Sequence, residues 1–213
     1  MKSCLLLISI FLFFTSCKDS PKTANQAIDK TSGNELLVDQ AHQGKVSNDT
    51  VEKYKKLGQK YASRTKAALG KKLIRAINEK GPDGAVGFCN INALPLTDSL
   101  SLTQGSKIWR VTDKPRNPLN KANEKELSFI ADFKKMLASG YPVEPILDTT
   151  DGQIDFYYPI TTNAMCLQCH GVPEEQIATS TLSVLDHLYP MDMARNYHEN
   201  EIRGIWAIRF NEK

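Results

Sequence analysis

The sequence predicts an α+β protein with an antiparallel sheet. Helical patterns fill the first half of the chain after about residue 47, strand patterns gather in the second half, and the connections are short. This order favours helices packed on an antiparallel sheet, because a parallel α/β fold would alternate helices and strands along the chain. The 213 residues, 41% of them hydrophobic, suit one domain of ordinary size.

Two helices are expected first. Apolar side chains recur at three- and four-residue intervals from Val51 to Ile77. Gly81-Pro82 should end this helix, since neither residue favours a helix interior. A second helix is expected over residues 83–102, where Pro95 should kink or interrupt it.

The remaining elements follow in short succession. The sequence predicts a strand at residues 107–111, a helix at 123–138, a hairpin at 147–160, a weak helix at 175–188 and a strand at 202–210. Asp151-Gly152 supplies the hairpin turn. In the last strand Ile205, Ala207 and Arg209 alternate with Trp206, Ile208 and Phe210.

The N-terminal residues have the pattern of a targeting segment. Lys2 precedes an apolar run from Cys4 to Phe14, and polarity switches abruptly after Cys17. This pattern resembles a bacterial lipoprotein signal peptide over residues 1–16, with Cys17 as the lipidated residue. The alternative is ordinary secretory cleavage with Cys17 as a free thiol. In either reading the protein is exported, and lipidation would hold it on the periplasmic or cell-surface side of a bacterial membrane.

The predicted domain boundaries follow from composition. Residues 17–47 are polar and contain few large apolar side chains, so they read as a lipidated Cys and a flexible tether. A tether of this length has a reach of roughly 30 Å. Residues 48–213 then form the folded domain. The formal charge of +3 lacks a Lys- and Arg-rich block with interleaved aromatic side chains, which argues against nucleic-acid binding.

The motif Cys166-Leu167-Gln168-Cys169-His170 carries the clearest chemical signal. Two thiols separated by two residues can reach the two vinyl groups of one porphyrin, and the adjacent His170 can then bind the iron. The sequence therefore predicts one covalent haem c, held by thioether bonds to Cys166 and Cys169. Covalent haem attachment takes place outside the cytoplasm, which agrees with the export signal.

Two other interpretations of these cysteines remain open. A Cys-x-x-Cys pair can be a redox disulfide, although that usually occurs in a thioredoxin-like βαβ setting, which this chain lacks. Cys89, Cys166, Cys169 and His170 could also form a zinc site with three Cys and one His ligand, although adjacent Cys169 and His170 make that awkward.

The second axial ligand of a haem iron is not fixed by the residues alone. Five side chains are chemically able to fill it: Cys89, His187, Met191, Met193 and His198. Core packing is the alternative for the two Met and for Cys89, and surface exposure is the alternative for the two His.

From about Asp49 onward the chain resembles the Tll-like haem domain family of single-haem c-type proteins. The resemblance rests on four groups of residues, which are residues 85–89, Arg110 with 116–120 and Glu126, residues 157–160 with 166–171, and residues 189–194 with Arg203-Gly204. The family tends to place a Gly ahead of the aromatic residue that follows Ala194. Here Arg195-Asn196 precede Tyr197, so a turn at that point is expected to differ.

The resemblance implies a fold and a ligand set. It implies a PAS-like antiparallel sheet with a long N-terminal helix and flanking helices. It also implies His170 as the proximal iron ligand and Cys89 as the distal one, which would explain the unpaired thiol. The helix that carries Cys89 would then lie over the haem, with Ala85 and Ala93 leaving room for the porphyrin.

Arg110 and Arg116 are candidates to bind the haem propionates, because a guanidinium pairs well with a carboxylate. The alternative is a structural loop network with Asp113 and Glu126.

Three functions follow from these features. The first is a one-electron carrier or relay with an unknown redox partner, not an enzyme, since two protein ligands leave no open iron site. The second is a haem-based redox or gas sensor that acts through a partner. The third is a peroxidase-like enzyme, which would need an open site and a placed acid–base residue, and the sequence shows no such pair.

Overall fold

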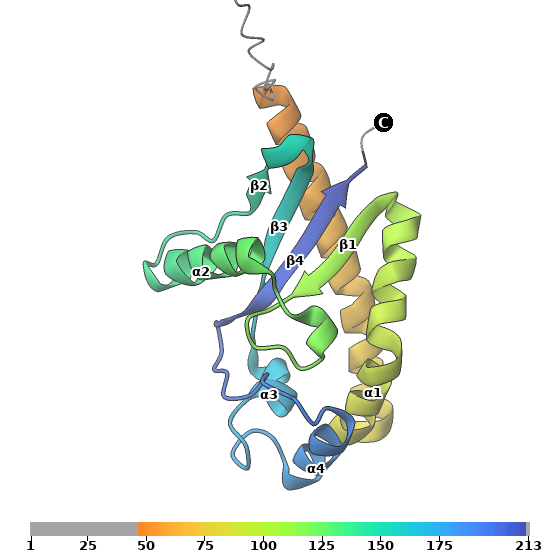
Figure 1. Cartoon of the computed structure of the whole chain (residues 1–213). Helices are drawn as coiled ribbons and strands as arrows, with labels where there is room; N and C mark the ends of the chain where they lie inside the picture. The colour runs from red at the N-terminus through yellow and green to blue at the C-terminus, as the bar shows by residue number, and fades with distance from the viewer. Residues whose placement is uncertain (1–46, 212–213) are drawn as a thin grey trace, which may run out of the picture. The chain divides into compact units, whose positions relative to one another are not determined.

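The computed structural model describes residues 47–211, and the predictions for the signal peptide, Cys17 and most of the tether lie outside this range. The described part is an α+β fold built on one four-stranded antiparallel sheet, in the order β1-β4-β3-β2. Its strands are β1 (Ser106–Val111), β2 (Ile146–Asp148), β3 (Ile154–Thr161) and β4 (Ile202–Phe210). The helices are α1 (Asn48–Gln104), α2 (Glu124–Ala138), α3 (Ala164–His170) and α4 (Thr179–Leu188). The predicted fold class is therefore confirmed (Figure 1).

The element α1 consists of two limbs that meet at Gly81. Gly81 has φ 68° and ψ 178°, which is not helical and which a residue with a Cβ rarely adopts. The first limb (residues 48–80) and the second limb (residues 82–104) lie side by side (Figure 1), and Gln104 Nε2 donates to Thr65 Oγ1 across them at 3.2 Å. The sequence prediction of a break at Gly81-Pro82 is confirmed.

A kink or an interruption was predicted at Pro95, and the interruption is wrong. Gly81 is the one residue of α1 with non-helical backbone angles, so the second limb continues through Pro95. A proline leaves the carbonyl four residues earlier without its helical partner. That carbonyl belongs to Ile91, whose residue is 72% exposed, so water can satisfy it.

The two faces of the sheet carry different helices. On one face, Ala62 and its neighbours on the first limb of α1 pack against Phe156, Trp206 and Ile208. On the other face, Ile130 and Phe133 of α2 contact the side chains of Tyr157, Ile205 and Ala207. The alternation predicted for β4 is therefore confirmed, and the buried Tyr157 shows that β3 is covered on both faces as well.

A third cluster joins the second limb of α1 to α4. Val86 packs there with Ile177, Leu182 and Leu185, and Thr181 donates a hydrogen bond to the Asp83 carboxylate at 2.5 Å. The 3-10 turns Pro118–Asn120 and Thr150–Gly152 complete the connections, the second of them closing the predicted hairpin. Within residues 47–211, no helix combines the length and the apolar character needed to cross a bilayer.

Candidate cofactor site

The Cys-x-x-Cys-His motif lies on a short helix that the sequence analysis did not predict. α3 begins after Asn163, whose side chain accepts from the backbone N–H of Cys166 at 3.2 Å and so caps the helix. Cys166 and Cys169 are three residues apart on this helix and therefore neighbours on its surface. The loop before α3 is fixed by Thr162, whose hydroxyl donates to the His198 carbonyl at 2.6 Å.

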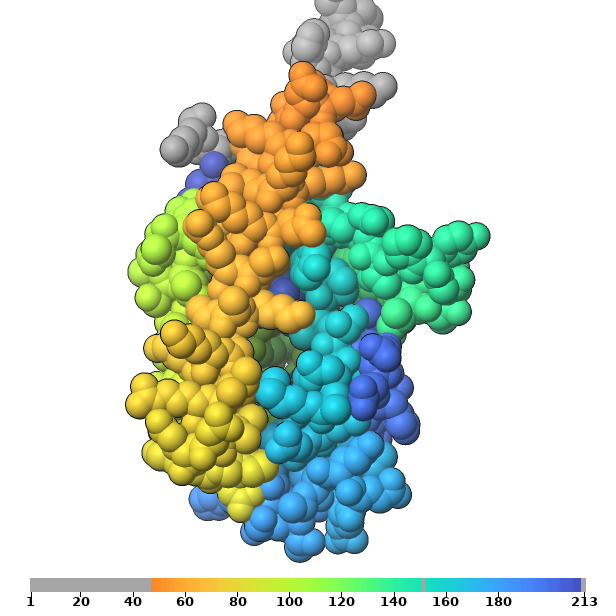
Figure 2. All heavy atoms as spheres, turned by 180° about the vertical axis from the view of Figure 1, so that it is seen from behind, coloured from red at the N-terminus to blue at the C-terminus, as the bar shows by residue number. Residues whose placement is uncertain are grey.

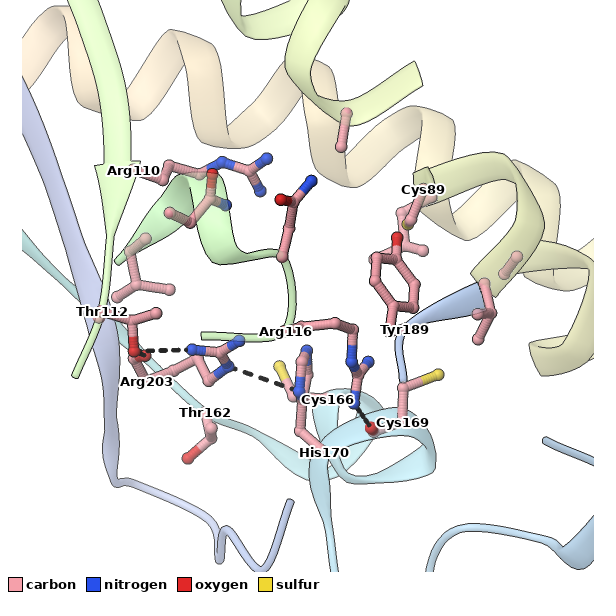
Figure 3. Close-up of a pocket in the computed structure, with 18 of the residues that line it drawn as sticks. Cys89, Arg110, Thr112, Arg116, Thr162, Cys166, Cys169, His170, Tyr189 and Arg203 are labelled. Carbon is pink, nitrogen blue, oxygen red and sulfur yellow. Dashed lines mark hydrogen bonds between the residues drawn. The ribbon is translucent and has the colours of Figure 1, made fainter. Parts of the chain in front are cut away.

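A cavity of about 300 Å³ brings this motif together with Cys89, a size suited to small ligands and cofactors. Its wall is assembled from α1, the end of β1 and the following loop, the end of β3, α3, Tyr189 and the start of β4 (Figure 3). Ala85, Cys89 and Ala93 line it from the second limb of α1, at four-residue intervals on one helix face. The space-filling view shows a hollow between the first limb of α1 and β3 (Figure 2). Leu73 of that limb and Ile160 of β3 are among the residues that line the cavity.

His170 is held as a neutral imidazole. Its Nδ1 lies 2.9 Å from the carbonyl oxygen of Ala194 and 3.4 Å from Nε of Arg203. The shorter contact assigns the proton to Nδ1, which donates to Ala194 and leaves the lone pair on Nε2 for a metal. Burial, followed by the charges of Arg116 and Arg203, holds the pKa of His170 well below its usual range. Tyr197 packs edge-on to the imidazole, with ring centroids 6.3 Å apart at 85°, and fixes its orientation.

The Cys89 thiol is half-buried in the cavity wall. Burial raises its pKa, and the charges of Arg110 and Arg116 offset part of that effect. Cys169 shows the same tendency, with burial raising the pKa of its thiol to about 11. Both are therefore protonated at neutral pH, and a bound metal ion or a covalent bond would displace the proton.

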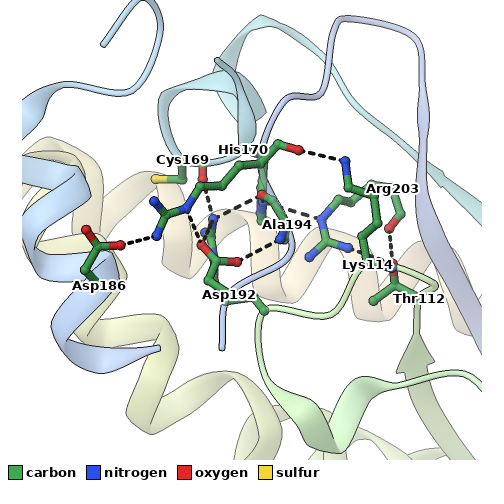
Figure 4. Close-up of polar contacts among 10 residues, drawn as sticks. Thr112, Lys114, Cys169, His170, Asp186, Asp192, Ala194 and Arg203 are labelled. Carbon is green, nitrogen blue, oxygen red and sulfur yellow. Dashed lines mark hydrogen bonds and ion pairs between the residues drawn. The ribbon is translucent and has the colours of Figure 1, made fainter. Parts of the chain in front are cut away.

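Two of the three arginines around the cavity were predicted, and they differ in what they bind. Arg116 donates to the carbonyl oxygens of Cys169 and Ala194 and forms an ion pair with Asp192 at 3.2 Å. Figure 4 shows these three partners close together. The predicted alternative network with Asp113 and Glu126 does not form.

Other side chains occupy those two carboxylates. Asp113 pairs with Lys134, and Glu126 caps α2 and accepts from Nε1 of Trp109 at 2.7 Å.

Arg110 has a hydrogen-bond donor without a partner. Its guanidinium lies 5.5 Å from the ring of Trp206, and its buried Nε has no hydrogen-bond partner. A buried donor without a partner costs free energy, so this side chain suits a carboxylate that enters the cavity.

Arg203, which was not assigned a role from the sequence, donates to Thr112 Oγ1 at 2.9 Å beside His170. It stands in a strand whose other residues are mostly apolar, and this contrast, together with its place in the family resemblance, was the available signal.

Four of the five candidate distal ligands lie away from the cavity. Met191 and Met193 are 69% and 56% exposed, and His187 and His198 are exposed too. The alternative of core packing for the two Met residues is therefore wrong. Cys89 is the one candidate that lines the cavity.

The zinc and disulfide interpretations find no support in the described part of the chain. The thiols of Cys89, Cys166 and Cys169 are free. Within residues 47–211, no three Cys, His, Asp or Glu side chains lie close enough to hold a metal ion together.

Comparison with known proteins gives the family of the chain. The family model described as Tll0287-like matches residues 21–211. The chain belongs to the Tll0287-like family. One solved structure, that of the cyanobacterial haem protein Tll0287, is similar with a TM-score of 0.53 and 15% identity, over 78% of this chain and 98% of that one. At this identity the similarity shows the fold. No curated protein matches the chain.

Proposed function

We propose that this member of the Tll0287-like family binds one haem c and works as a one-electron carrier or relay. The observation that carries the proposal is the neutral His170, whose Nδ1 is held by Ala194 and whose Nε2 is available beside two neighbouring thiols. Cys166 and Cys169 would hold the group by thioether bonds, and Arg110 would bind a propionate. A haem bound there supplies reversible one-electron chemistry.

Cys89 is proposed as the second axial ligand. It lines the cavity from the second limb of α1, whereas the motif comes from α3. Arg110 and Arg116 lower the energy of a thiolate at this position, which supports ligation as the anion. If His170 and Cys89 both held the iron, the chain would leave no position on it for a substrate. The described residues that line the cavity include neither Asp nor Glu, so a peroxidase-type acid–base carboxylate is missing from the wall.

A sensor is the second candidate, and the break at Gly81 favours it. Cys89 lies eight residues after the non-helical Gly81, on a limb that packs against α4. If Cys89 held the iron, a change at the cofactor that freed its thiol would also free this limb from the cavity. Such a mechanism requires a bistable element and a partner that reads it.

Export and lipid anchoring at Cys17 complete the proposal. They rest on the apolar run before Cys17 and on the need for haem c attachment outside the cytoplasm. Replacing Cys17 by Ser should release the protein from the membrane fraction and abolish labelling by a fatty-acid analogue. A Cys17→Ser protein that stayed in the membrane fraction and was still labelled would contradict the anchor. It would leave the haem proposal unaffected.

The test of the cofactor is expression of the full chain together with haem c maturation proteins. The expected result is a covalent haem that survives denaturation and disappears in the Cys166→Ala/Cys169→Ala variant. Optical and EPR spectra should show a low-spin ferric haem with a thiolate ligand. Cys89→Ser should lose that signature, whereas Ala93→Ser on the same helix face should keep it. A wild-type chain without covalent haem would refute the proposal.

Reduction separates the two candidate functions. A carrier should remain low-spin and unresponsive to carbon monoxide when reduced. A sensor should exchange its Cys89 ligand and then bind carbon monoxide.

A further inference from the structure

The first limb of α1 carries a concentration of positive charge that the cofactor site does not use. Residues 48–80 contain ten Lys and Arg against three Asp and Glu, whereas residues 81–211 contain eleven against sixteen. The small overall charge of +3 therefore conceals a strongly basic limb on an acidic remainder. Because of this separation of charge, an anionic surface would attract the first limb and repel the rest of the domain.

Six of these cations form a single line along the helix, called here the basic stripe. Its members follow one another at intervals of three, four, four, seven and four residues: Lys53, Lys56, Lys60, Arg64, Lys71 and Arg75. These intervals place them on one side of an α-helix, and all six are exposed. At 1.5 Å per residue the stripe extends for about 33 Å.

The opposite side of the limb is buried. Gly58, Ala62, Thr65 and Ala76 face the rest of the domain, so the basic stripe points outward. In the view from behind, this limb forms a ridge along the surface, in orange to yellow (Figure 2). Within the described residues, Arg75 is the one member of the stripe with an acidic partner, Glu79 at 2.7 Å.

We infer that the basic stripe is a docking surface for an anionic lipid membrane. A straight line of long cationic side chains on a projecting ridge can reach a plane of headgroups along its length. Each Lys or Arg near such a surface contributes roughly a fivefold factor to binding. The limb begins directly after the first 47 residues, where the apolar run from Cys4 to Phe14 and Cys17 are placed by the sequence. A lipid anchor at Cys17 would tether the basic stripe close to the bilayer, which raises its effective concentration at the membrane surface.

An acidic protein fits the stripe less well. Protein interfaces have an apolar and aromatic centre and are depleted in Lys. On the first limb, Ile74 is the one large apolar residue that is substantially exposed, at 45%. A headgroup plane needs no such centre. With the stripe on a membrane, α2 on the other face of the sheet would point away from it.

The inference goes beyond the proposed haem chemistry, and its test is independent of it. Residues 44–213 form one compact unit, and the hydrophobic clusters of the described residues all belong to it, so this segment can be tested without the proposed anchor. Its binding to vesicles of phosphatidylcholine would be compared with vesicles that contain about one third phosphatidylglycerol. Binding is expected to the anionic vesicles alone and should weaken steeply with salt.

Two variants with equal charge change locate the surface. Lys56→Gln/Lys60→Gln/Arg64→Gln removes three charges from the stripe and should lower the vesicle partition coefficient roughly hundredfold. Lys107→Gln/Lys121→Gln/Lys135→Gln removes three exposed charges elsewhere and should leave it within about threefold, because screening weakens distant charges.

Three outcomes would overturn the inference: no binding to anionic vesicles, an equal loss in both variants, or stripe-dependent binding to an acidic polypeptide or nucleic acid without vesicle binding. A failure of haem attachment would leave this result unchanged.

Discussion

At the scale of single residues, Arg116 organises the loop behind His170. It joins the Cys169 and Ala194 carbonyls to Asp192, whose side chain is 1% exposed. Arg116→Gln should lower the free energy of unfolding by about 2 kcal/mol, because a nearly buried carboxylate loses its main partner. Arg195→Gln is the matched control, since Arg195 also contacts Asp192 but pairs outward with the exposed Asp186. Arg195→Gln should lower the free energy of unfolding, measured with urea, by less than about 1 kcal/mol. An equal loss of stability in both variants would contradict this role of Arg116.

Asp192 makes the stability of the domain depend on acid pH. Burial alone would raise its pKa, but the charge and hydrogen bond of Arg116, with the Ala194 amide and Arg195, hold it below the usual value. A lowered pKa in the folded state contributes stability above the unfolded value near 4, and this contribution disappears as pH falls through the folded value. Asp192→Asn should therefore be less stable at pH 7 and lose less stability below about pH 4. Parallel curves of unfolding free energy against pH for the two proteins would show that Asp192 is not the group responsible.

The same residues show what sequence reasoning could reach. Cys166, Cys169 and His170 are recognisable because their spacing is the one that a covalently held porphyrin would require. From the residues alone Cys89 was one of five chemically able candidates, and the family resemblance singled it out. In the structure it is the one of the five that lines the cavity. Arg203 could not be assigned, because its proximity to His170 arises from strands and helices far apart in the sequence.

At the scale of elements, the packing of α1 on the sheet depends on a close approach at Gly58. A Cβ added there would lie 2.3 Å from Cγ of Phe156, a buried ring in the core. Gly58→Ala should destabilise the domain by about 1–3 kcal/mol through overpacking. Gly70→Ala is the matched change on the same limb, where a Cβ meets nothing within 4 Å. It should stabilise by up to about 1 kcal/mol, because alanine favours a helix. Thermal unfolding would compare them, and stabilisation by both changes would contradict the close packing.

The elements that were predicted well have local signals. Gly81 marks the break in α1, and alternating apolar residues mark β3 and β4. Two errors have physical reasons. A seven-residue helix such as α3 gives too short a pattern for periodicity, although Asn163 offered a cap signal. Pro95 is tolerated because the carbonyl it frees belongs to an exposed residue.

At the scale of the whole molecule, the cavity is where distant parts of the chain meet. Its wall draws on residues 73–94, 110–120, 160–170 and 189–204. The arginines of the cavity repel one another. Burial lowers the pKa of Arg110, and the nearby positive charge of Arg203 lowers it further. The same cations would favour a group that brings carboxylates into the cavity. Cofactor binding should therefore stabilise the segments around the cavity more than the rest of the domain.

Hydrogen exchange would measure this uneven stabilisation. The haem-loaded protein would be compared with the Cys166→Ala/Cys169→Ala variant prepared in the same way. Amides of the second limb around Cys89, residues 85–94, and of the loop at residues 189–195 should exchange roughly tenfold more slowly in the loaded protein. Amides of α2 should be unchanged, because α2 packs on the face of the sheet away from the first limb and none of its residues lines the cavity. Slowing in α2 equal to that around Cys89 would mean that the cofactor stabilises the fold as one unit, and the absence of slowing would mean that the cavity is already rigid without it.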